Sequence, residues 1–292
     1  MVPLHVDAAG RARDTTDDDE RSNRKGPDLD EDEQQKARDE ESLNAGVTYE
    51  AIRREGEKEL ARSPQALAWS GLAAGLSMGF ILVAEGLLRS HLPDAPWRPL
   101  VAKLGYSIGF LIVMLGSQQL YTENTLTPIV PLLSRKSWEM VGRVLRLWAI
   151  VLVTNLVGTI VFAWVVARTT LFDADVHVAF LGVAREAMRG DFATTLLRAI
   201  FAGWLIALMV WMLPGSKGAQ FAVIVVMTYL VGMAGLAHII AGSTEVAYLV
   251  ARGAATWGDY AGRFVVPTLL GNTLGGVTLV AALNHAQVVG GE

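Results

Sequence analysis

Six apolar runs dominate the sequence from Ala66 onward, and each is close to the length of a helix that crosses a bilayer. A hydrocarbon core about 30 Å thick needs roughly 20 apolar helical residues to cross it. Because lipid offers no hydrogen-bond partners, a spanning backbone must satisfy its own donors and acceptors, as a helix does. The runs cover about residues 66–88, 101–120, 144–167, 194–213, 219–250 and 264–283. We therefore expect an all-α membrane protein with six transmembrane helices per protomer.

The fifth run contains a polar interruption. Between Tyr229 and Val250 the apolar sequence carries His238 and then the polar group Gly242–Glu245. A helix break facing lipid would leave backbone groups without partners, and ionisable residues at that depth usually face a protein interior or a water-filled path. We therefore expect a break at Gly242–Glu245 in the middle of a pore; the alternative is a helix that ends before an ordinary loop.

The second run is interrupted in a similar way. It stops at the polar segment 118–125 and resumes as a short apolar segment, 126–133, which contains Pro128 and Pro131. A polar interruption followed by a half-length apolar segment is typical of the discontinuous helices of transporters. We expect the second helix to be broken here.

The two halves of the membrane part resemble each other. Their middle helices are interrupted near Thr122-Glu123 and Thr244-Glu245, and each half closes with a helix that carries Asn-x-x-Gly, starting at Asn155 and Asn272. Three helices per half is an odd number, so the second half would enter the membrane inverted. An inverted repeat with broken helices in matching positions predicts a transport site where the breaks meet. The alternative is a chance resemblance of two short motifs.

The N-terminal region has a different composition. The whole chain of 292 residues is 52% hydrophobic with a formal net charge of −4, but residues 1–62 are rich in acidic side chains and almost free of aromatics. Such a segment buries too little apolar surface to offset its ordering entropy. We expect a disordered acidic tail over 1–62, with a membrane-proximal helix over Glu50–Arg62, either on the cytoplasmic surface or solvated. Residues 63–292 would form the membrane domain.

The distribution of charged residues gives only a weak indication of how the chain is oriented across the membrane. Lys and Arg flank the helices in similar numbers on both sides, so the positive-inside rule does not decide it. No apolar signal-peptide segment precedes the tail, and basic residues gather at Arg135, Lys136, Arg143 and Arg146. Both features favour a multi-pass protein of the inner membrane with both termini in the cytoplasm.

Several function classes are disfavoured. The chain has no cysteine, which excludes disulfides, a thiol nucleophile and a cysteine metal site. It carries no phosphate-binding loop, histidine cluster with metal-ligand spacing, or serine elbow. We expect no enzyme activity, cofactor, metal or nucleic-acid partner. The expected partners are the lipid bilayer, a small monovalent solute and further copies of the chain.

Five motifs are spread over the membrane part. They are Gly105-Tyr-Ser-Ile-Gly109, Leu120-Tyr121-Thr122, Leu208-Met-Val-Trp211-Met, Gly235-Leu-Ala-His238-x-Ile240-Ala241 and Gly271-Asn272-x-x-Gly275-Gly276. Together these motifs resemble those of the formate/nitrite transporter family. The resemblance covers roughly Glu59 to Asn284 and implies a homopentamer of six-helix protomers, each with its own pore and an aquaporin-like arrangement. It also implies passage of small monovalent anions such as formate, nitrite, hydrosulfide or lactate.

The resemblance assigns roles by position. His238 matches the family's pore histidine, and Thr122 matches the threonine that faces it. Five further residues fall where the family has apolar constrictions. These are Tyr106, Phe110, Leu120, Tyr121 and Val231.

The sequence also departs from the family pattern. Ala237 stands where the family has an acidic residue before the histidine, and Gly242 and Gly203 replace two asparagines. A family lysine before the fourth helix has no aligned lysine here, and Arg185 or Arg189 would have to substitute for it. We therefore expect a divergent member of the family, and the sequence does not specify its anion substrate.

Two acids add to these departures. Ionised Glu123 and Glu245 in a narrow path would repel an anion by roughly 4 kcal/mol at about 4 Å and an effective dielectric near 20. We expect them to be neutralised by arginines or protons, or to point away from the lumen. Otherwise the chain would be a channel for a neutral solute or a cation.

The expected mechanism is physical rather than enzymatic. Burial disfavours the charged form of an imidazole, so a neutral His238 between two constrictions could lend a proton to a passing weak-acid anion. The structural alternative is a core histidine bonded to backbone. A non-transporting membrane anchor or regulatory protein, recruiting a partner through its acidic tail, is the alternative function.

Overall fold

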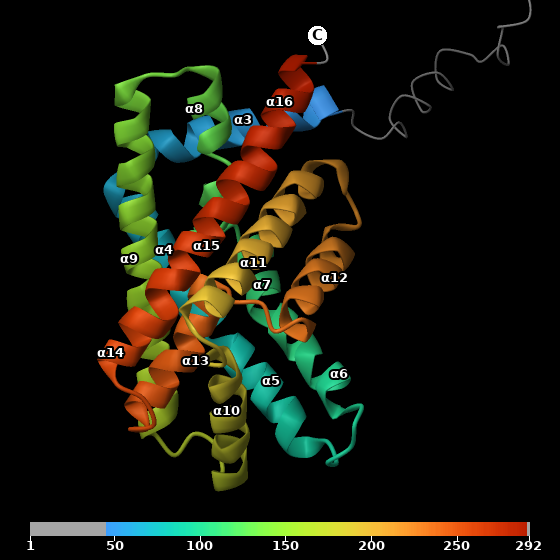
Figure 1. Cartoon of the computed structure of the whole chain (residues 1–292), viewed down its shortest axis with the longest axis vertical. Helices are drawn as coiled ribbons and strands as arrows, with labels where there is room; N and C mark the ends of the chain where they lie inside the picture. Colours follow the sequence, from blue (N-terminus) through green and yellow to red (C-terminus); the bar gives the residue numbers. More distant parts are fainter. Residues whose placement is uncertain (1–44, 291–292) are drawn as a thin grey trace, which may run out of the picture. The chain divides into compact units, whose positions relative to one another are not determined.

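The computed structural model describes residues 45–290 of the chain, and within them the secondary structure is helical. The predicted tail up to residue 44 lies outside the described residues. Figure 1 shows most of the longer helices running side by side along one axis. In chain order the helices are α3 Ala45–Ala61, α4 Pro64–Met78, α5 Phe80–His91, α6 Arg98–Ala102, η1 Lys103–Gly105, α7 Tyr106–Leu115, η2 Glu123–Thr125, α8 Ile129–Ser134, α9 Trp138–Arg168, α10 Ala174–Ala187, α11 Phe192–Met212, η3 Leu213–Gly215, α12 Gln220–Met233, α13 Ile239–Ala251, α14 Trp257–Asp259, η4 Tyr260–Val265, α15 Val266–Gly276, η5 Val277–Ala282 and α16 Leu283–Gly290.

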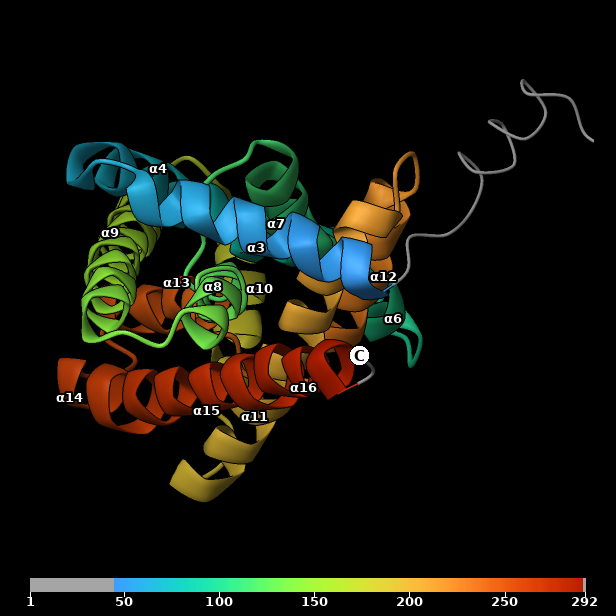
Figure 2. The ribbon, with the colours of Figure 1, turned by 90° about the horizontal axis from the view of Figure 1, so that it is seen from above.

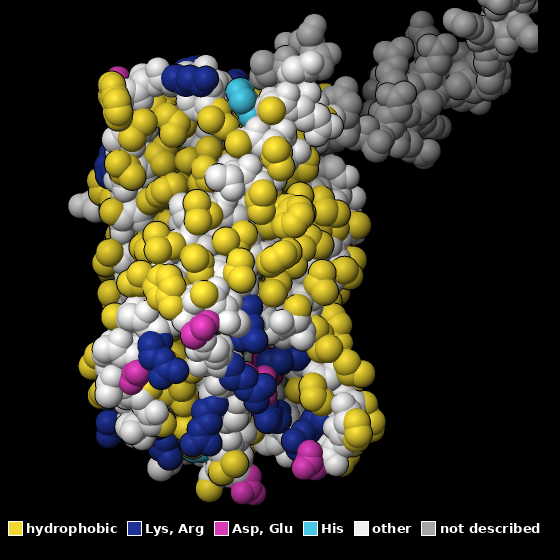
Figure 3. Space-filling view, in the orientation of Figure 1, with side chains coloured by type: hydrophobic (Ala, Val, Ile, Leu, Met, Phe, Trp, Pro, Cys, Tyr) yellow, Lys and Arg dark blue, Asp and Glu magenta, His cyan; other side chains and the backbone are white. Residues whose placement is uncertain are grey.

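Five helical segments are long and apolar enough to cross a membrane, among the described residues. They lie in five of the six apolar runs, and the other run contains the shorter apolar helices α12 and α13. Large apolar side chains such as Val153, Val161 and Phe201 are half exposed on the outer helices. Figure 3 shows a broad apolar band on this face, with Lys and Arg gathered at the end near α10. This is the surface that a spanning protein presents to lipid.

The second apolar run is broken, as predicted. Helix α7 ends at Leu115, and two residues later Ser117 lies in the left-handed region at φ 50°. The backbone N–H groups of Ser117 and Gln118 donate to the carbonyls of Met114 and Val113, at 3.2 and 3.0 Å. This is the Schellman pattern of a helix C-terminus. The chain then leaves the helix axis before η2 and α8.

The fifth run is also broken, but at a different place from the predicted one. Helix α12 ends at Met233, and two residues later Gly235 lies in the left-handed region at φ 60°. The N–H groups of Gly235 and Leu236 donate to the carbonyls of Gly232 and Val231 at 3.1 and 3.0 Å. The break covers 234–238, and Gly242–Glu245 lie inside α13. The prediction of a break at Gly242–Glu245 was therefore wrong. A left-handed backbone suits glycine, which makes Gly235 the local signal of the real break.

Two helix pairs pack closely along their lengths, α4 with α9 and α11 with α15. Glycines lie at both contacts: a Cβ at Gly158 would come within 2.7 Å of the Leu72 carbonyl oxygen, and one at Gly275 within 2.1 Å of that of Ile200. The predicted Asn-x-x-Gly motifs therefore allow backbone-to-backbone approach.

Helices α3 and α10 cover the two ends of the bundle. Viewed from above, α3 crosses the end where α8 and α16 lie (Figure 2), and it contacts both of them. The helix lies in the region where the sequence predicts one over Glu50–Arg62. At the other end, α10 packs on α5 and α13.

Candidate functional site

His238 lies at the break of the fifth run and caps α13. Its Nδ1 accepts hydrogen bonds from the backbone N–H groups of Ile240 and Ala241, at 3.3 and 3.2 Å. An imidazole nitrogen that accepts carries no proton, so the proton of the neutral ring is on Nε2. Nε2 lies 2.8 Å from the hydroxyl oxygen of Thr122, to which it therefore donates. The cap fixes both the tautomer and the direction of the ring.

Asn155 holds the first broken segment in place. Its side-chain N–H₂ donates to the carbonyls of Gly71 and Gln119, at 2.7 and 2.9 Å, and its oxygen accepts from the N–H of Tyr121 at 2.9 Å. These bonds satisfy backbone groups that the break removes from a helix. The hydroxyl of Thr125 adds a bond to the carbonyl of Thr122 at 2.7 Å.

Asn272 holds the second broken segment by an equivalent set of bonds. Its N–H₂ donates to the carbonyls of Ala199 and Ala237, at 2.8 and 2.9 Å, and its oxygen accepts from the N–H of Ile239 at 2.8 Å. The correspondence places Leu120 at the position equivalent to His238, each lying between the two backbone groups that the asparagine binds.

The predicted constriction residues surround His238 in part. The ring of Phe110 lies edge-on to the imidazole with centroids 5.0 Å apart, and Tyr106 contacts Phe110 at 5.6 Å. Leu120 and Val231 are fully buried. Tyr121 points elsewhere: its hydroxyl bonds to Thr273 Oγ1 at 2.9 Å and its ring contacts Trp148. Phe110 is therefore the predicted constriction residue in ring contact with the histidine.

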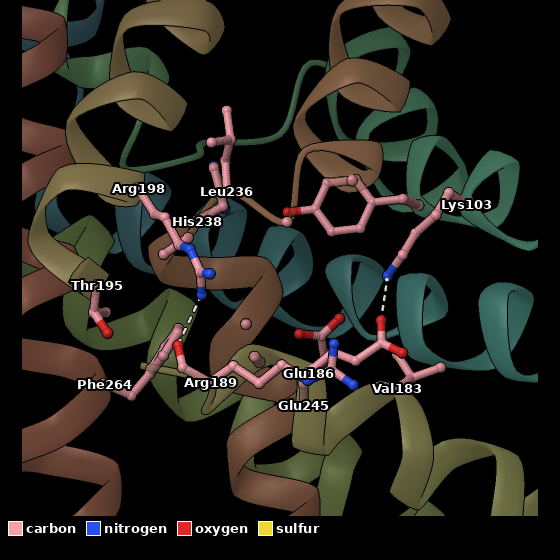
Figure 4. Close-up of a pocket in the computed structure, with 16 residues that line it drawn as sticks. Lys103, Val183, Glu186, Arg189, Thr195, Arg198, Leu236, His238, Glu245 and Phe264 are labelled. Atoms are coloured by element: carbon pink, nitrogen blue, oxygen red, sulfur yellow. Dashed lines mark hydrogen bonds and ion pairs between the residues drawn. The ribbon is translucent and has the colours of Figure 1, made fainter. Parts of the chain in front are cut away.

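Two cavities lie toward opposite ends of α7 and α11. The α10-side cavity, about 50 Å³, is lined by His238, by Tyr106 near the start of α7 and by Thr195 near the start of α11 (Figure 4). The α3-side cavity, about 430 Å³, is lined by Met114 and Val210 near the other ends of the same helices. The buried His238–Thr122 pair lies between these two ends.

Several charged residues line or border the α10-side cavity. Lys103 Nζ forms ion pairs with carboxylate oxygens of Glu85 at 2.5 Å and Glu186 at 3.1 Å, and Arg89 pairs with Glu186 at 2.7 Å. Burial alone would raise the pKa of Glu186, but Lys103 and Arg89 bring that pKa below its ordinary value. Glu186 is therefore ionised and committed to these cations.

Two arginines also line the α10-side cavity. Arg189 and Arg198 line the cavity, and Arg198 donates to the backbone carbonyl of Arg189 at 2.8 Å. Of the two arginines proposed from the sequence as substitutes for a family lysine, Arg189 lines the cavity and Arg185 does not.

The predicted acids both lie at cavities. Glu245 lines the α10-side cavity and is 7% exposed. Glu123 lines the α3-side cavity, and its Oε1 is buried without a hydrogen-bond partner among the described residues. The sequence-based expectation of arginine partners therefore does not apply to Glu123 or Glu245, since neither forms an ion pair within the described part of the chain.

Glu59 brings α3 to the first broken segment. Its carboxyl accepts from the Thr127 hydroxyl and from Gln119 Nε2, the latter at 3.2 Å. Burial raises the pKa of Glu59 to about 7. Sequence reasoning missed Glu59, Lys103 and Arg198; a lysine at the start of an apolar run was the available signal for Lys103.

No group of three or more His, Cys, Asp or Glu side chains suited to a metal ion occurs within residues 45–290. The donors at the site are an imidazole N–H, hydroxyls and guanidinium groups, a set that suits a small anion or a neutral polar solute.

Comparison with known proteins identifies the family of the chain. The formate/nitrite transporter family model matches residues 46–286. The inner membrane protein YfdC of Escherichia coli K12 is 41% identical over 244 residues, which are 84% of this chain and 79% of YfdC. The formate channel BtFdhC of Bacillus thuringiensis is 26% identical over 233 residues, covering 77% and 88% of the two chains.

Solved structures share the fold. An FNT-family ion channel superposes with a TM-score of 0.68 at 20% identity, over 80% of this chain and 96% of the other. A pentameric formate channel with formate bound superposes with a TM-score of 0.60 at 19% identity, over 81% and 99%. The chain belongs to the formate/nitrite transporter family, which confirms the resemblance seen in the sequence. It is a multi-pass membrane protein.

Proposed function

We propose that this protein is a transmembrane channel or proton-coupled transporter for small monovalent anions of the formate or nitrite type, with His238 as its pore histidine. The observation that carries the proposal is the His238–Thr122 hydrogen bond of 2.8 Å, which joins the two broken segments across 116 residues of sequence. Broken helices that meet at membrane depth are the usual position of a transport site.

The chemistry of the pair suits an anion. Nε2 of His238 is a donor, and Thr122 accepts from it. Within the described residues the hydroxyl proton of Thr122 has no acceptor, so it can be donated to a substrate. A desolvated anion gains most from donors that are already in position. Phe110, packed edge-on against the imidazole, and the buried Leu120 and Val231 would exclude hydrated ions.

The dimensions favour a small substrate. A cavity must offer roughly 10–15 Å³ to the centre of a water-sized sphere if it is to hold one water. The α10-side cavity offers about 50 Å³, which is room for a few waters or one small ion. Formate and nitrite are within this size.

We further propose six membrane crossings in two inverted three-helix repeats. The matched helix ends at Ser117 and Gly235 and the matched bonds of Asn155 and Asn272 support this repeat. They replace the Thr122-Glu123 and Thr244-Glu245 pairing proposed from the sequence.

The assembly would be a homopentamer in the inner membrane. A solved neighbour of the same fold is a pentameric formate channel, and the half-exposed apolar residues of the outer helices offer surface to lipid or to further copies. Helices α3 and α16 contact each other, with Tyr49 Oη 2.6 Å from His285 Nδ1, so both ends of the membrane part share one face, which we assign to the cytoplasm.

Uptake into proteoliposomes tests the function. The purified protein is reconstituted, and formate, nitrite, lactate and hydrosulfide are supplied in turn at two pH values on either side of neutrality. We expect flux of at least one anion above that of empty vesicles. Absence of flux for the whole panel would contradict the proposal and favour the non-transporting anchor.

His238→Asn tests the role of the histidine. Asparagine can accept the Ile240 and Ala241 N–H groups as a helix cap, so the protein should fold and assemble like the wild type. We expect it to lose pH-dependent anion flux, because the imidazole donor next to Thr122 is gone. Wild-type flux and pH profile in this variant would exclude His238 from the pathway.

A neutral solute or a cation is the second candidate substrate, because carboxyl groups of Glu245 and Glu123 line the two cavities. Urea and methylammonium added to the same panel distinguish it. Their passage in the absence of anion flux would favour this candidate.

A further inference from the structure

The carboxyl group of Glu245 is buried in the α10-side cavity. The residue is 7% exposed, lines the same cavity as His238, and forms no hydrogen bond or ion pair with the residues that the structure describes. Glu245 lies within α13, seven positions after His238, which caps the start of that helix. Figure 4 shows the two residues in the wall of this cavity.

Two of the three cations that line the cavity are bound to other groups. Lys103 is paired with Glu85 and Glu186, and the Arg198 guanidinium donates to the carbonyl of Arg189. A buried carboxylate without hydrogen bonds or a counter-ion is costly, and a neutral carboxylic acid avoids that cost. The titratable and charged groups around Glu245 are Glu85, Lys103, Tyr106, Glu186, Arg189, Arg198 and His238.

His238 is poorly placed to supply a proton itself. Its Nδ1 accepts from two backbone N–H groups, so the neutral ring has one proton, on Nε2. Loss of that proton would leave an imidazolate anion, and an imidazolium would place a third N–H against the two of the cap. His238 is therefore a hydrogen-bond donor, and a proton for the substrate must come from another group.

We propose that Glu245 is the group in the α10-side cavity that exchanges a proton with a small weak-acid anion before the substrate passes His238. This rests on the proposed transport function. The O–H bond of the Glu245 carboxylic acid breaks, its electron pair stays on the carboxylate, and a new O–H bond forms on the anion. A hydronium ion from the aqueous phase restores the acid, and the reverse transfer releases a substrate that leaves by this side.

The substrate class follows from this step. An anion that takes up a proton crosses the apolar segment as a neutral acid, whereas the anions of strong acids, such as chloride, remain charged. Small monocarboxylates such as formate are therefore expected substrates, and their transport through the protein carries one proton with each anion.

Paired glutamine and aspartate variants test the proposal. Glutamine matches the shape of a protonated Glu245 but cannot transfer a proton, whereas Glu245→Asp keeps a carboxyl group. Glu186→Gln is the comparison variant, because it makes the same Glu-to-Gln change in the same cavity at a carboxylate that is committed to Lys103 and Arg89. Each variant is checked for assembly by size-exclusion chromatography.

Formate and chloride uptake and luminal pH are then followed in proteoliposomes that contain a trapped pH-sensitive dye. In the wild type we expect formate uptake to carry protons and chloride uptake to be negligible. Glu245→Gln should lower formate uptake about tenfold or more, in line with the loss of a proton-transfer group, and remove its pH dependence. Glu245→Asp should retain part of the uptake with a shifted pH profile, and Glu186→Gln should keep its pH dependence.

Three results would overturn the inference while the transport function stands: unchanged or faster formate uptake in Glu245→Gln with a wild-type pH profile, the same loss in Glu186→Gln, or chloride uptake equal to that of formate. If Glu245→Gln does not assemble, an unshifted pH profile in Glu245→Asp overturns it. A wild-type protein that moves no anion contradicts the proposed function as well.

Discussion

At the scale of single residues, two asparagines replace the backbone partners that the broken helices lose. Asn272 makes three hydrogen bonds at once, two of them to the segment that carries His238. A buried backbone donor or acceptor without a partner costs about 1–3 kcal/mol. The position of His238 therefore depends on a side chain from a different helix.

Asn272→Ala should lower the stability of the protein by about 3 kcal/mol, because it leaves buried carbonyls and an N–H without partners. Thermal unfolding in detergent measures the effect. Asn284→Ala is a suitable control, since that side chain donates one bond, to the carbonyl four residues earlier. Equal melting temperatures for the two variants would show that Asn272 does not hold the break.

At the scale of elements, α3 is linked to the first broken segment through Glu59. The pKa of Glu59 is raised by burial to about 7, against an ordinary value of 4.5, so the folded state holds this proton more tightly than the unfolded state. The stabilisation is fully present below about pH 4.5 and is lost as pH rises through 7. Glu55 and Arg62 on α3, and Glu123 across the cavity, are the other charges at this cluster.

We therefore expect α3 to dock more tightly at acidic than at alkaline pH, by about 3 kcal/mol at most. Hydrogen exchange of the α3 amides at the two pH values measures this. In Glu59→Gln the protection of the α3 amides, after correction for the intrinsic exchange rate at each pH, should be nearly the same at both pH values. Protection that is independent of pH in the wild type would contradict the assignment.

The contact of α11 with α15 depends on a close backbone approach. A methyl group at Gly275 would lie 2.1 Å from the carbonyl oxygen of Ile200, so Gly275→Ala must push the helices apart. We expect a loss of about 1–3 kcal/mol, as for other overpacked sites.

Gly142→Ala is the matched control. Gly142 lies in α9 with no atom within 4 Å of an added Cβ, and alanine favours a helix over glycine. Its melting temperature in detergent should equal or exceed that of the wild type. A Gly275→Ala variant as stable as Gly142→Ala would exclude a tight contact.

At the scale of the whole molecule, the membrane domain should be independent of the acidic tail. Removal of residues 1–44 should leave the oligomer and its melting temperature unchanged, because that segment has little apolar surface to bury. Removal of 1–61 should be destabilising, since Tyr49, Ile52 and Leu60 of α3 are buried. Light scattering after size-exclusion chromatography measures the assembly, and a smaller oligomer after the shorter truncation would contradict the prediction.

Much of the helical architecture follows from the sequence. Apolar runs of about 20 residues must be helices in lipid, because no other partner for the backbone exists there. The helices found at Trp138–Arg168 and Phe192–Met212 therefore coincide closely with predicted runs. Five motifs spread over the membrane part, each of them local in sequence, were together sufficient to place the chain in its family.

The position of the second break was decided by tertiary structure. Gly242–Glu245 is polar in composition and still forms part of α13, because Ser243 Oγ lies 3.1 Å from Tyr260 Oη and Glu245 faces a cavity. The chain instead leaves the helix near Gly235. There the side chain of Asn272, which is 33 residues from Ile239 in the sequence, replaces the lost backbone bonds. A polar residue can remain inside a membrane helix when its surroundings provide a hydrogen-bond partner or a cavity, and those surroundings come from distant parts of the chain.

The same holds for the site. His238 and Thr122 could be named from the sequence, but the tautomer of the ring depends on where α13 begins, and its partner comes from 116 residues away. Lys103, Arg198 and Glu59 carry no signal of their own in the sequence strong enough to place them at a cavity. Local patterns determine which segments become helices, whereas contacts between distant segments determine which polar groups share a buried space and what charge that space contains.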